Sequence, residues 1–289
     1  MSVFIAYLIV VIVWSTTPLA ISWSSESVGP MAALSLRMLI SILIVTVVRA
    51  ISKCPVMCFE KHWRAYASGA IGLFPCMALV YWSSDYLPSS LISVLFGLAP
   101  FAVVLLNLLI SATWDVSRGQ FLGMILAFSG LVIVMIPSDS AGSASVLGVT
   151  LILCSVAVYA LSTLLVKRYA VDVNITNQLY GTLLFASPLF SVAWLIESGG
   201  EPPEITPRAL YAILYLGAMG SVVGFLAYFY LLKRISAAAV SLVTMITPMV
   251  AVALGVSLNN EVLSLYACLG VACIFLGLWT FRYFQIRAI

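Results

Sequence analysis

The chain has 289 residues, of which 63% are hydrophobic and only 8% are charged. Soluble domains carry about 25% charged residues, so this chain has too few charges to cover a water-facing surface. Together with a mean hydropathy of +1.17, this composition indicates an integral membrane protein. It excludes a cytosolic enzyme, a secreted disulfide scaffold and a disordered chain. We expect the lipid bilayer, and no nucleic acid, as a partner.

Ten apolar stretches follow one another along the chain, each close to the roughly 20 residues that a membrane-spanning helix needs. They lie near residues 2–22, 30–49, 65–84, 89–111, 119–137, 145–166, 174–196, 208–231, 236–257 and 262–282. The segments between them are too short to form a separate domain. The sequence therefore predicts an all-α integral membrane fold with ten transmembrane helices.

The basic residues are concentrated on one side of this arrangement. Eleven of the 13 Lys and Arg residues fall in alternate loops and at the ends, Arg208 falls in an opposite loop, and Arg37 lies within the second span. Because cytoplasmic loops carry the excess of Lys and Arg, we expect both termini in the cytoplasm and the protein in the cell (inner) membrane. Met1 to Ala6 holds no basic residue, so we expect the first span to be a mature helix rather than a cleaved signal peptide.

The two halves of the chain align when the second is shifted back by about 147 residues. Pro100 then meets Pro248, and Gly123 and Gly130 meet Gly270 and Gly277. Because each half holds five spans, an odd number, the second half enters the membrane from the opposite side. Inverted repeats of this kind are common in secondary transporters, which bind substrate near the midplane between the repeats.

Several motifs also resemble a known family. They are W-S-T-T-P (Trp14 to Pro18), P-x6-R (Pro30 to Arg37), Y-x-x-S-S-L-I-S-x-L-x-x-x-x-P (Tyr86 to Pro100) and a related segment that ends at Pro248. Together they are similar to the EamA-type branch of the drug/metabolite transporter superfamily. The resemblance implies two inverted five-helix EamA-like repeats, residues 1–140 and 141–289, in a carrier of small metabolites.

The resemblance further implies that the first, third, fourth, sixth, eighth and ninth helices line a central cavity. Polar and aromatic side chains at helical spacing mark the faces where substrate would bind. The candidate substrate-binding residues are Trp14, Thr17, Arg37, Tyr81, Tyr159, Thr163, Gln178, Tyr180 and Tyr228. The candidate hinge or gating residues are Pro18, Pro100, Pro248 and Asp85. For each aromatic residue the alternative is packing or anchoring at the lipid interface.

Arg37 is the most informative single residue, because an arginine inside a span costs roughly 2.5–3.5 kcal/mol on insertion scales. No acidic residue lies at a similar depth in any predicted span. Its partner is therefore backbone carbonyls, water or an anionic group of the substrate. The alternatives are that its side chain extends to the outer headgroups, or binds Glu26 or carbonyls at helix ends, in a structural or gating role.

These features predict a secondary transporter that moves a small-molecule substrate, such as an amino acid, by export or exchange through alternating access. A passive channel and a membrane-embedded enzyme are the alternative classes; no catalytic or cofactor-binding motif supports the enzyme. Cys54, Cys58 and His62 lack a fourth ligand for a metal site, and we expect neither metal nor cofactor. The small-residue faces leave a homodimer open.

Overall fold

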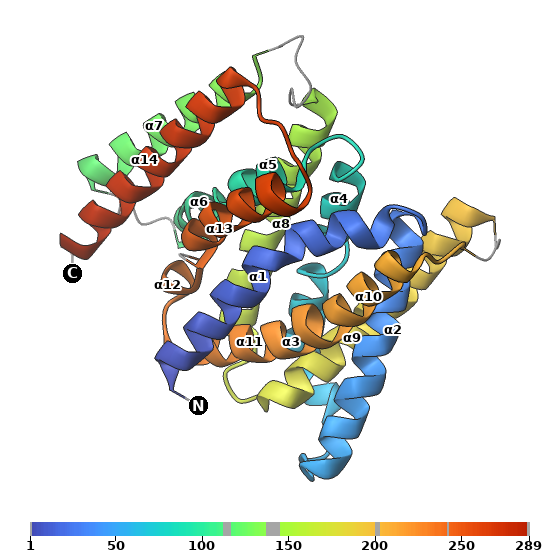
Figure 1. The fold of residues 1–289 in the computed structure, drawn as a ribbon. Coiled ribbons are helices and arrows are strands. Elements are labelled where there is room, and N and C mark those ends of the chain that lie inside the picture. Colours follow the sequence, from blue (N-terminus) through green and yellow to red (C-terminus); the bar gives the residue numbers. More distant parts are fainter. Residues whose placement is uncertain (1, 112–116, 137–144, 200–202, 242, 288–289) are drawn as a thin grey trace.

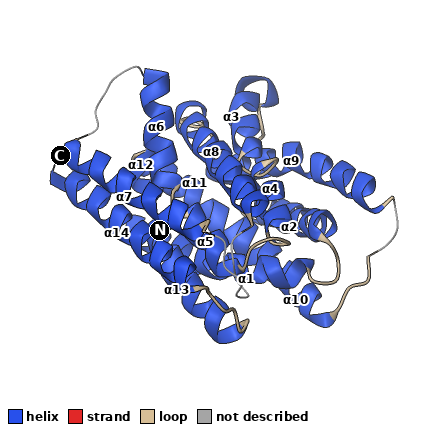
Figure 2. Ribbon diagram, turned by 90° about the horizontal axis from the view of Figure 1, so that it is seen from above, coloured by secondary structure: helices blue, strands red, loops and turns tan. Residues whose placement is uncertain are grey.

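Figure 1 shows the fold as a computed structural model, which describes residues 2–111, 117–136, 145–199, 203–241 and 243–287. These residues form helices joined by short turns, and no strand occurs among them (Figure 2). The predicted boundary between the halves, at residues 140 and 141, lies outside the described residues.

The helices of the first half are α1 (Val3–Ser25), α2 (Pro30–Ile51), α3 (Phe59–Ile71), α4 (Cys76–Ser83), α5 (Ser89–Phe96), α6 (Ala99–Ser111) and α7 (Arg118–Val134). Those of the second half are α8 (Val146–Tyr169), α9 (Ile175–Ser198), α10 (Pro207–Tyr215), the π-helix η1 (Leu216–Val223), α11 (Gly224–Arg234), α12 (Ala237–Ser241), α13 (Val243–Leu258) and α14 (Leu265–Arg287).

Eight helical stretches in the described chain, some made of two or three helices end to end, are long and apolar enough to cross a membrane. Two shorter apolar helices, Arg118–Val134 and Ile246–Leu258, coincide with the fifth and ninth predicted spans. The third stretch begins at Phe59, earlier than the expected start near residue 65.

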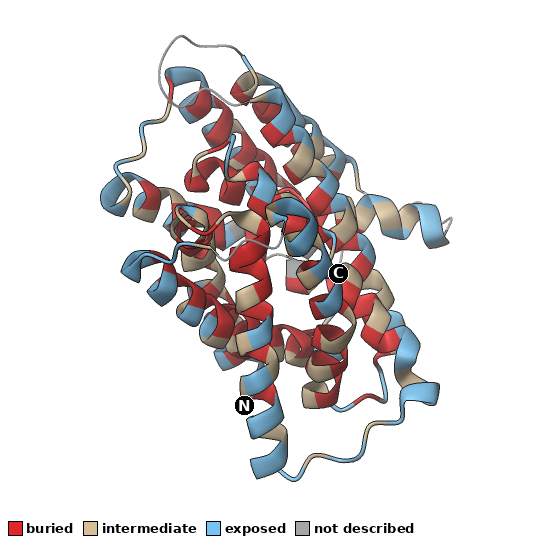
Figure 3. Ribbon diagram, turned by 90° about the vertical axis from the view of Figure 1, so that its right-hand side faces the viewer, coloured by how far each residue is buried: buried red, intermediate tan, exposed pale blue. Residues whose placement is uncertain are grey.

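The surface of the bundle is apolar and part of its interior is polar, as a lipid environment favours. Leu43, Phe128 and Trp279 are 67%, 65% and 66% exposed, whereas Arg37 and Gln178 are each 1% exposed. Figure 3 shows the buried residues concentrated along the middle of the bundle. The fold therefore encloses its polar side chains and presents hydrocarbon to the outside.

Three of the stretches are interrupted inside the bundle. The third changes from α3 to α4 through residues 72–75, the fourth changes from α5 to α6 at Gly97 and Leu98, and the seventh, Pro207–Arg234, widens into η1. Pro100 lies in the first turn of α6, where its missing N–H costs no helical hydrogen bond. These interruptions place irregular backbone inside the protein, where other side chains can satisfy its polar groups.

Helices α7 and α14 lie side by side at one edge of the bundle (Figures 1 and 2). A methyl group on Gly123 would lie 2.7 Å from the carbonyl oxygen of Gly277, and one on Gly130 would lie 2.6 Å from that of Gly270. The four glycines therefore form a closely packed seam between the two helices. The alignment pairs Gly123 with Gly270 and Gly130 with Gly277, but in the structure Gly123 contacts Gly277 and Gly130 contacts Gly270. The contact between the two helices is therefore reciprocal.

Replacing Gly123 with Ala is expected to destabilise this seam. The added methyl would meet the backbone nitrogen of Phe281 at 2.6 Å, and overpacking of this kind costs about 1–3 kcal/mol. Thermal unfolding in detergent should show a lower Tm for G123A. The control is Ser129→Ala, an exposed position on the same helix, and equal Tm values for the two variants would contradict the close packing.

Candidate functional site

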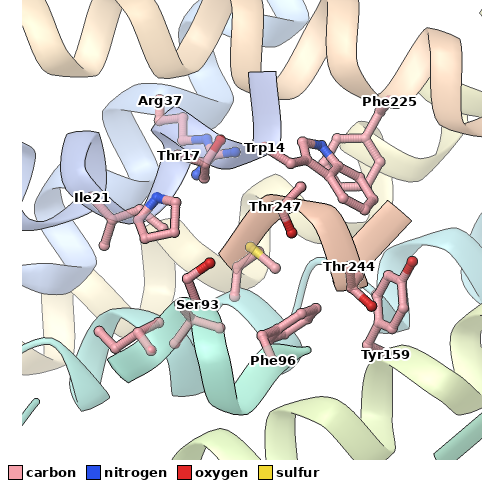
Figure 4. Close-up of a pocket in the computed structure, with 15 residues that line it drawn as sticks. Trp14, Thr17, Ile21, Arg37, Ser93, Phe96, Tyr159, Phe225, Thr244 and Thr247 are labelled. Carbon is pink, nitrogen blue, oxygen red and sulfur yellow. The ribbon is translucent and has the colours of Figure 1, made fainter. Parts of the chain in front are cut away.

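A cavity of about 80 Å³ lies in the middle of the bundle, between elements of both halves (Figure 4). Arg37, Thr17 and Trp14 line one side of it, and Ser93 and Phe96 line the opposite side. The remaining lining residues are Pro18, Ile21, Gly72, Met77, Val80, Ile92, Tyr159, Phe225, Thr244 and Thr247. The lining thus combines one cation, several hydroxyls and an aromatic wall.

The cation is Arg37, which projects from α2 and is almost completely buried. Its Nε donates a hydrogen bond to the hydroxyl oxygen of Ser221 at 2.8 Å, and its Nη1 lies 3.4 Å from the hydroxyl of Tyr81. Among the described residues Arg37 forms no salt bridge, and Glu26 pairs instead with Arg208 at 3.4 Å. The sequence had suggested carbonyls, water, an anion or Glu26, so the two hydroxyl partners are a correction.

Two neutral hydroxyls orient the guanidinium but do not neutralise its charge. A buried charge without a counter-ion is unfavourable by several kcal/mol. An anionic group in the cavity would relieve this cost with charge-assisted hydrogen bonds, and a planar carboxylate matches the guanidinium geometry best. The site is therefore chemically suited to a small molecule that carries a carboxylate.

The π-helix η1 shapes this arrangement. It carries Ser221, and a methyl group on its Gly220 would lie 3.3 Å from Nη2 of Arg37. At the start of α11, a methyl on Gly224 would lie 3.0 Å from the indole nitrogen of Trp14. Gly220 and Gly224 are four residues apart, a spacing that is typical of close helix packing in membranes. The structure instead uses both glycines to make room for site side chains, and single-turn π segments are frequent at functional sites.

The aromatic wall is centred on Trp14. Its ring centroid lies 5.3 Å from that of Tyr228, 6.1 Å from that of Phe225 and 6.2 Å from that of Tyr159. Such spacings are typical of favourable aromatic pairs. Tyr228 and Thr163 do not line the cavity; their hydroxyls bond each other at 2.7 Å behind the wall. They hold the wall in place rather than face the cavity.

Polar atoms with spare hydrogen-bonding capacity also lie at the cavity. The hydroxyl of Tyr159 is buried and, among the described residues, makes no hydrogen bond. Pro18 has no N–H, so it leaves the carbonyl of Trp14 without its helical donor. The hydroxyl of Thr17 bonds the carbonyl of Val13 at 2.8 Å. These groups could bind the polar part of a ligand whose carboxylate faces Arg37.

One of the two aligned prolines, Pro248 of α13, packs against the break between α5 and α6. A methyl on Gly97 would lie 3.2 Å from the ring of Pro248 and 3.2 Å from the carbonyl oxygen of Thr244. Pro248 cannot donate to that carbonyl, which lies four residues earlier on α13. Of the predicted hinge positions, Pro248 therefore contacts the break between α5 and α6, and Pro100 lies directly after that break, in the first turn of α6.

Three predicted site residues lie away from the cavity. Gln178 donates to the carbonyl of Ala65 at 2.7 Å and faces a separate pocket. Tyr180 lies under Arg49, at 4.5 Å from its guanidinium carbon. Asp85 is exposed in the turn after α4, where partial burial and the charge of Glu197 raise its pKa. None of the three faces the central cavity.

The sequence reasoning missed several lining residues. Ser221 lies on η1 and Phe225 on α11, Ser93 and Phe96 lie on α5, and Thr244 and Thr247 lie on α13. A signal was available for the last pair, because two threonines three residues apart share a helix face just before Pro248. No pattern in the sequence indicated η1.

Ser221→Ala is expected to destabilise the protein, because it leaves Nε of Arg37 without its acceptor. An unsatisfied buried donor costs about 1–3 kcal/mol, and more when charged. The measurement is Tm in detergent as a double-mutant cycle with Arg37→Met. Ser221→Ala should lower Tm in the native background and have little effect in the Arg37→Met background. Equal losses in both backgrounds would mean that the Ser221–Arg37 bond carries no stability.

Comparisons with known proteins agree with this architecture. Residues 1–136 and 146–283 match the model of the EamA-like transporter family. Protein PagO of Salmonella typhimurium is 24% identical over 96% of this chain and 92% of its own length. An uncharacterized transporter of Archaeoglobus fulgidus is 25% identical over 92% of this chain and 93% of its own length.

A solved crystal structure shares the fold, with a TM-score of 0.72 at 18% identity over 99% of this chain and 98% of that one. The family match covers nearly all of the sequence, in two segments of similar length. The chain therefore belongs to the EamA-like transporter family of the drug/metabolite transporter superfamily and is a multi-pass membrane protein.

Proposed function

We propose that this protein is a secondary carrier that moves small, carboxylate-bearing amphiphilic metabolites across the cytoplasmic membrane, with amino acids as the best candidates. The observation that carries the proposal is Arg37, a buried cation without a carboxylate partner among the described residues, at a cavity that also has an aromatic wall. A carboxylate would neutralise the guanidinium while an apolar side chain lies against Trp14 and Phe225.

The proposed topology has ten spans, arranged as two inverted repeats with both termini in the cytoplasm. The two shorter apolar helices supply the fifth and ninth spans. The paired family matches support the repeats. So does the seam between α7 and α14, because reciprocal contacts are what a two-fold axis generates. The bias of Lys and Arg supports the orientation.

Alternating access fits the way the cavity is built. Its walls come from both halves, and the helices that supply them are interrupted at cavity depth, at residues 72–75, at Gly97 and Leu98 and along η1. Small rotations at such breaks would expose the site first to one side and then to the other. A channel would need a continuous polar path, and the cavity is too small and too apolar to favour one.

Substrate exchange, or net export down a gradient, suits the site better than proton coupling. No carboxylate lies among the described residues that line the cavity, and intramembrane carboxylates are the usual proton relays.

The seam glycines are already used within the chain, where α7 packs on α14, so a homodimer would need another surface.

Flux in proteoliposomes tests the proposal directly. A panel of labelled amino acids and their decarboxylated amines should show saturable uptake of the carboxylates, stimulated by unlabelled substrate inside. Arg37→Ala should raise the apparent KM for carboxylates about 10- to 100-fold, the equivalent of one or two charge-assisted hydrogen bonds. Arg37→Lys keeps the charge and should lose less. Saturable uptake that is indifferent to the carboxylate would exclude Arg37 as its ligand.

Asp85 offers a test of coupling. Its raised pKa makes it the nearest candidate for a proton relay, yet it lies in an exposed turn. Asp85→Asn should therefore retain exchange flux, and an imposed pH gradient should not drive accumulation in either protein. Accumulation that follows the pH gradient and disappears in Asp85→Asn would show proton coupling through this residue.

A further inference from the structure

The loop between α13 and α14 binds the start of α5 through one carboxylate. Oε1 of Glu261 accepts hydrogen bonds from the backbone N–H and the hydroxyl of Ser89, at 2.9 and 2.6 Å. Oε2 accepts the same pair of bonds from Ser90, at 3.0 and 2.6 Å. Both serines are almost completely buried. Four hydrogen bonds thus join two segments about 170 residues apart in the sequence.

The same carboxylate is linked to the end of α1. The side-chain amide of Asn259 donates to Oε1 of Glu261 at 3.2 Å, and the indole N–H of Trp23 donates to the carbonyl oxygen of Asn259 at 3.0 Å. Gly255 leaves room for this group, because a methyl there would lie 2.9 Å from the carboxyl carbon of Glu261. The contact is therefore a connected cluster rather than a single surface bond.

The cluster lies directly above the walls of the cavity. Ser89 begins α5, and one turn further along that helix Ser93 lines the cavity. Ile21, which also lines the cavity, precedes Trp23 on α1 by two residues. The carboxylate therefore closes the ends of two cavity helices against each other.

The chemistry makes this closure strong but reversible. A carboxylate at a helix N-terminus satisfies N–H groups that have no intrahelical partner and interacts favourably with the helix dipole. Burial raises the pKa of Glu261, but the hydrogen bonds from Ser89, Ser90 and Asn259 lower it by a larger amount, so the pKa lies below its usual value. Glu261 is thus ionised at neutral pH, and no covalent link prevents the ends from separating.

Two other sets of polar contacts lie near helix ends, one of them at the same end of the bundle. Glu197 accepts from the N–H of Met31 at 3.1 Å and from the indole of Trp82 at 3.3 Å. At the opposite end of the bundle, Lys167 donates to the carbonyls of Leu232 and Ile235 within the second half. Glu197 therefore also joins the two halves. Glu261 differs from it in accepting four hydrogen bonds from two buried serines at the start of a cavity helix.

We propose that Glu261, bound to Ser89 and Ser90, is the latch that holds this end of the cavity closed, and that its release opens the site to the outer side. The proposal rests on the carrier function proposed above. The latch is nevertheless observable without transport, because it controls access to the cavity.

The test uses a single-cysteine reporter, Ser93→Cys, in a chain whose six native cysteines are replaced. Purified protein in detergent is treated with a charged, membrane-impermeant maleimide, and the rate of modification is followed by mass. Glu261→Gln and the double variant Ser89→Ala/Ser90→Ala should each raise this rate about tenfold, since one charge-assisted hydrogen bond shifts a two-state equilibrium by about that factor. The matched control, Glu204→Gln, removes an exposed acidic residue from a neighbouring loop and should leave the rate unchanged.

Partial unfolding is controlled with native Cys76, which is buried and bonded to Ser155. In a chain that retains only Cys76, the rate should stay low with and without Glu261→Gln. Unchanged modification at residue 93 in both latch variants, or an equal rise at Cys76, would overturn the latch.

Labelling in intact cells separates the latch from the proposed topology and function. If the latch variants raise the modification rate at residue 93 in cells as well as in detergent, the latched end faces the outside. If the rate rises in detergent but not in cells, the latch is supported and the proposed orientation is contradicted. If the rate rises in cells and in detergent but no compound shows flux, the latch is supported and the proposed substrates are contradicted.

Discussion

The structure depends on accommodating one positive charge inside an apolar bundle. Arg37 is buried without a carboxylate partner among the described residues, and the neighbouring elements are shaped around it. η1 widens the helical stretch from α10 to α11 so that Ser221 reaches Nε, and Gly220 leaves space for the guanidinium. Hydroxyls fix the orientation of the charge without cancelling it. The unneutralised charge is the basis of the anion binding proposed above.

The aromatic wall is the complementary half of the same site. Trp14 lies between the rings of Tyr228, Phe225 and Tyr159, and Tyr228 is held from behind by Thr163. This wall excludes water, and a drier cavity strengthens the field of Arg37 on a bound carboxylate. In the proposed carrier, the charge of Arg37 and the aromatic wall therefore act together, which favours amphiphilic solutes over inorganic anions.

The sequence predicted the elements far better than the site. Hydropathy located the apolar helices because lipid imposes a strong and uniform constraint on them. Arg37, Trp14, Thr17, Pro18 and Tyr159 were found because they are unusual in a span. Ser221 was not found, since a serine among glycines has no distinctive pattern and η1 depends on packing. Gln178 and Tyr180 were predicted at the site, but helical spacing alone does not say which face of α9 points to the cavity.

The two ends of the cavity differ although the halves that build them are alike. The proposed repeats supply matching helices, matching breaks and the reciprocal seam of α7 and α14. The charged groups are not duplicated: the alignment places Arg37 on an uncharged part of α9, and Glu261 closes one end through bonds to the buried Ser89 and Ser90. A duplicated scaffold makes two open states similar in energy, and single residues then bias between them. In such a carrier a few hydrogen bonds suffice to set which side is closed at rest, because the states they separate differ little in packing.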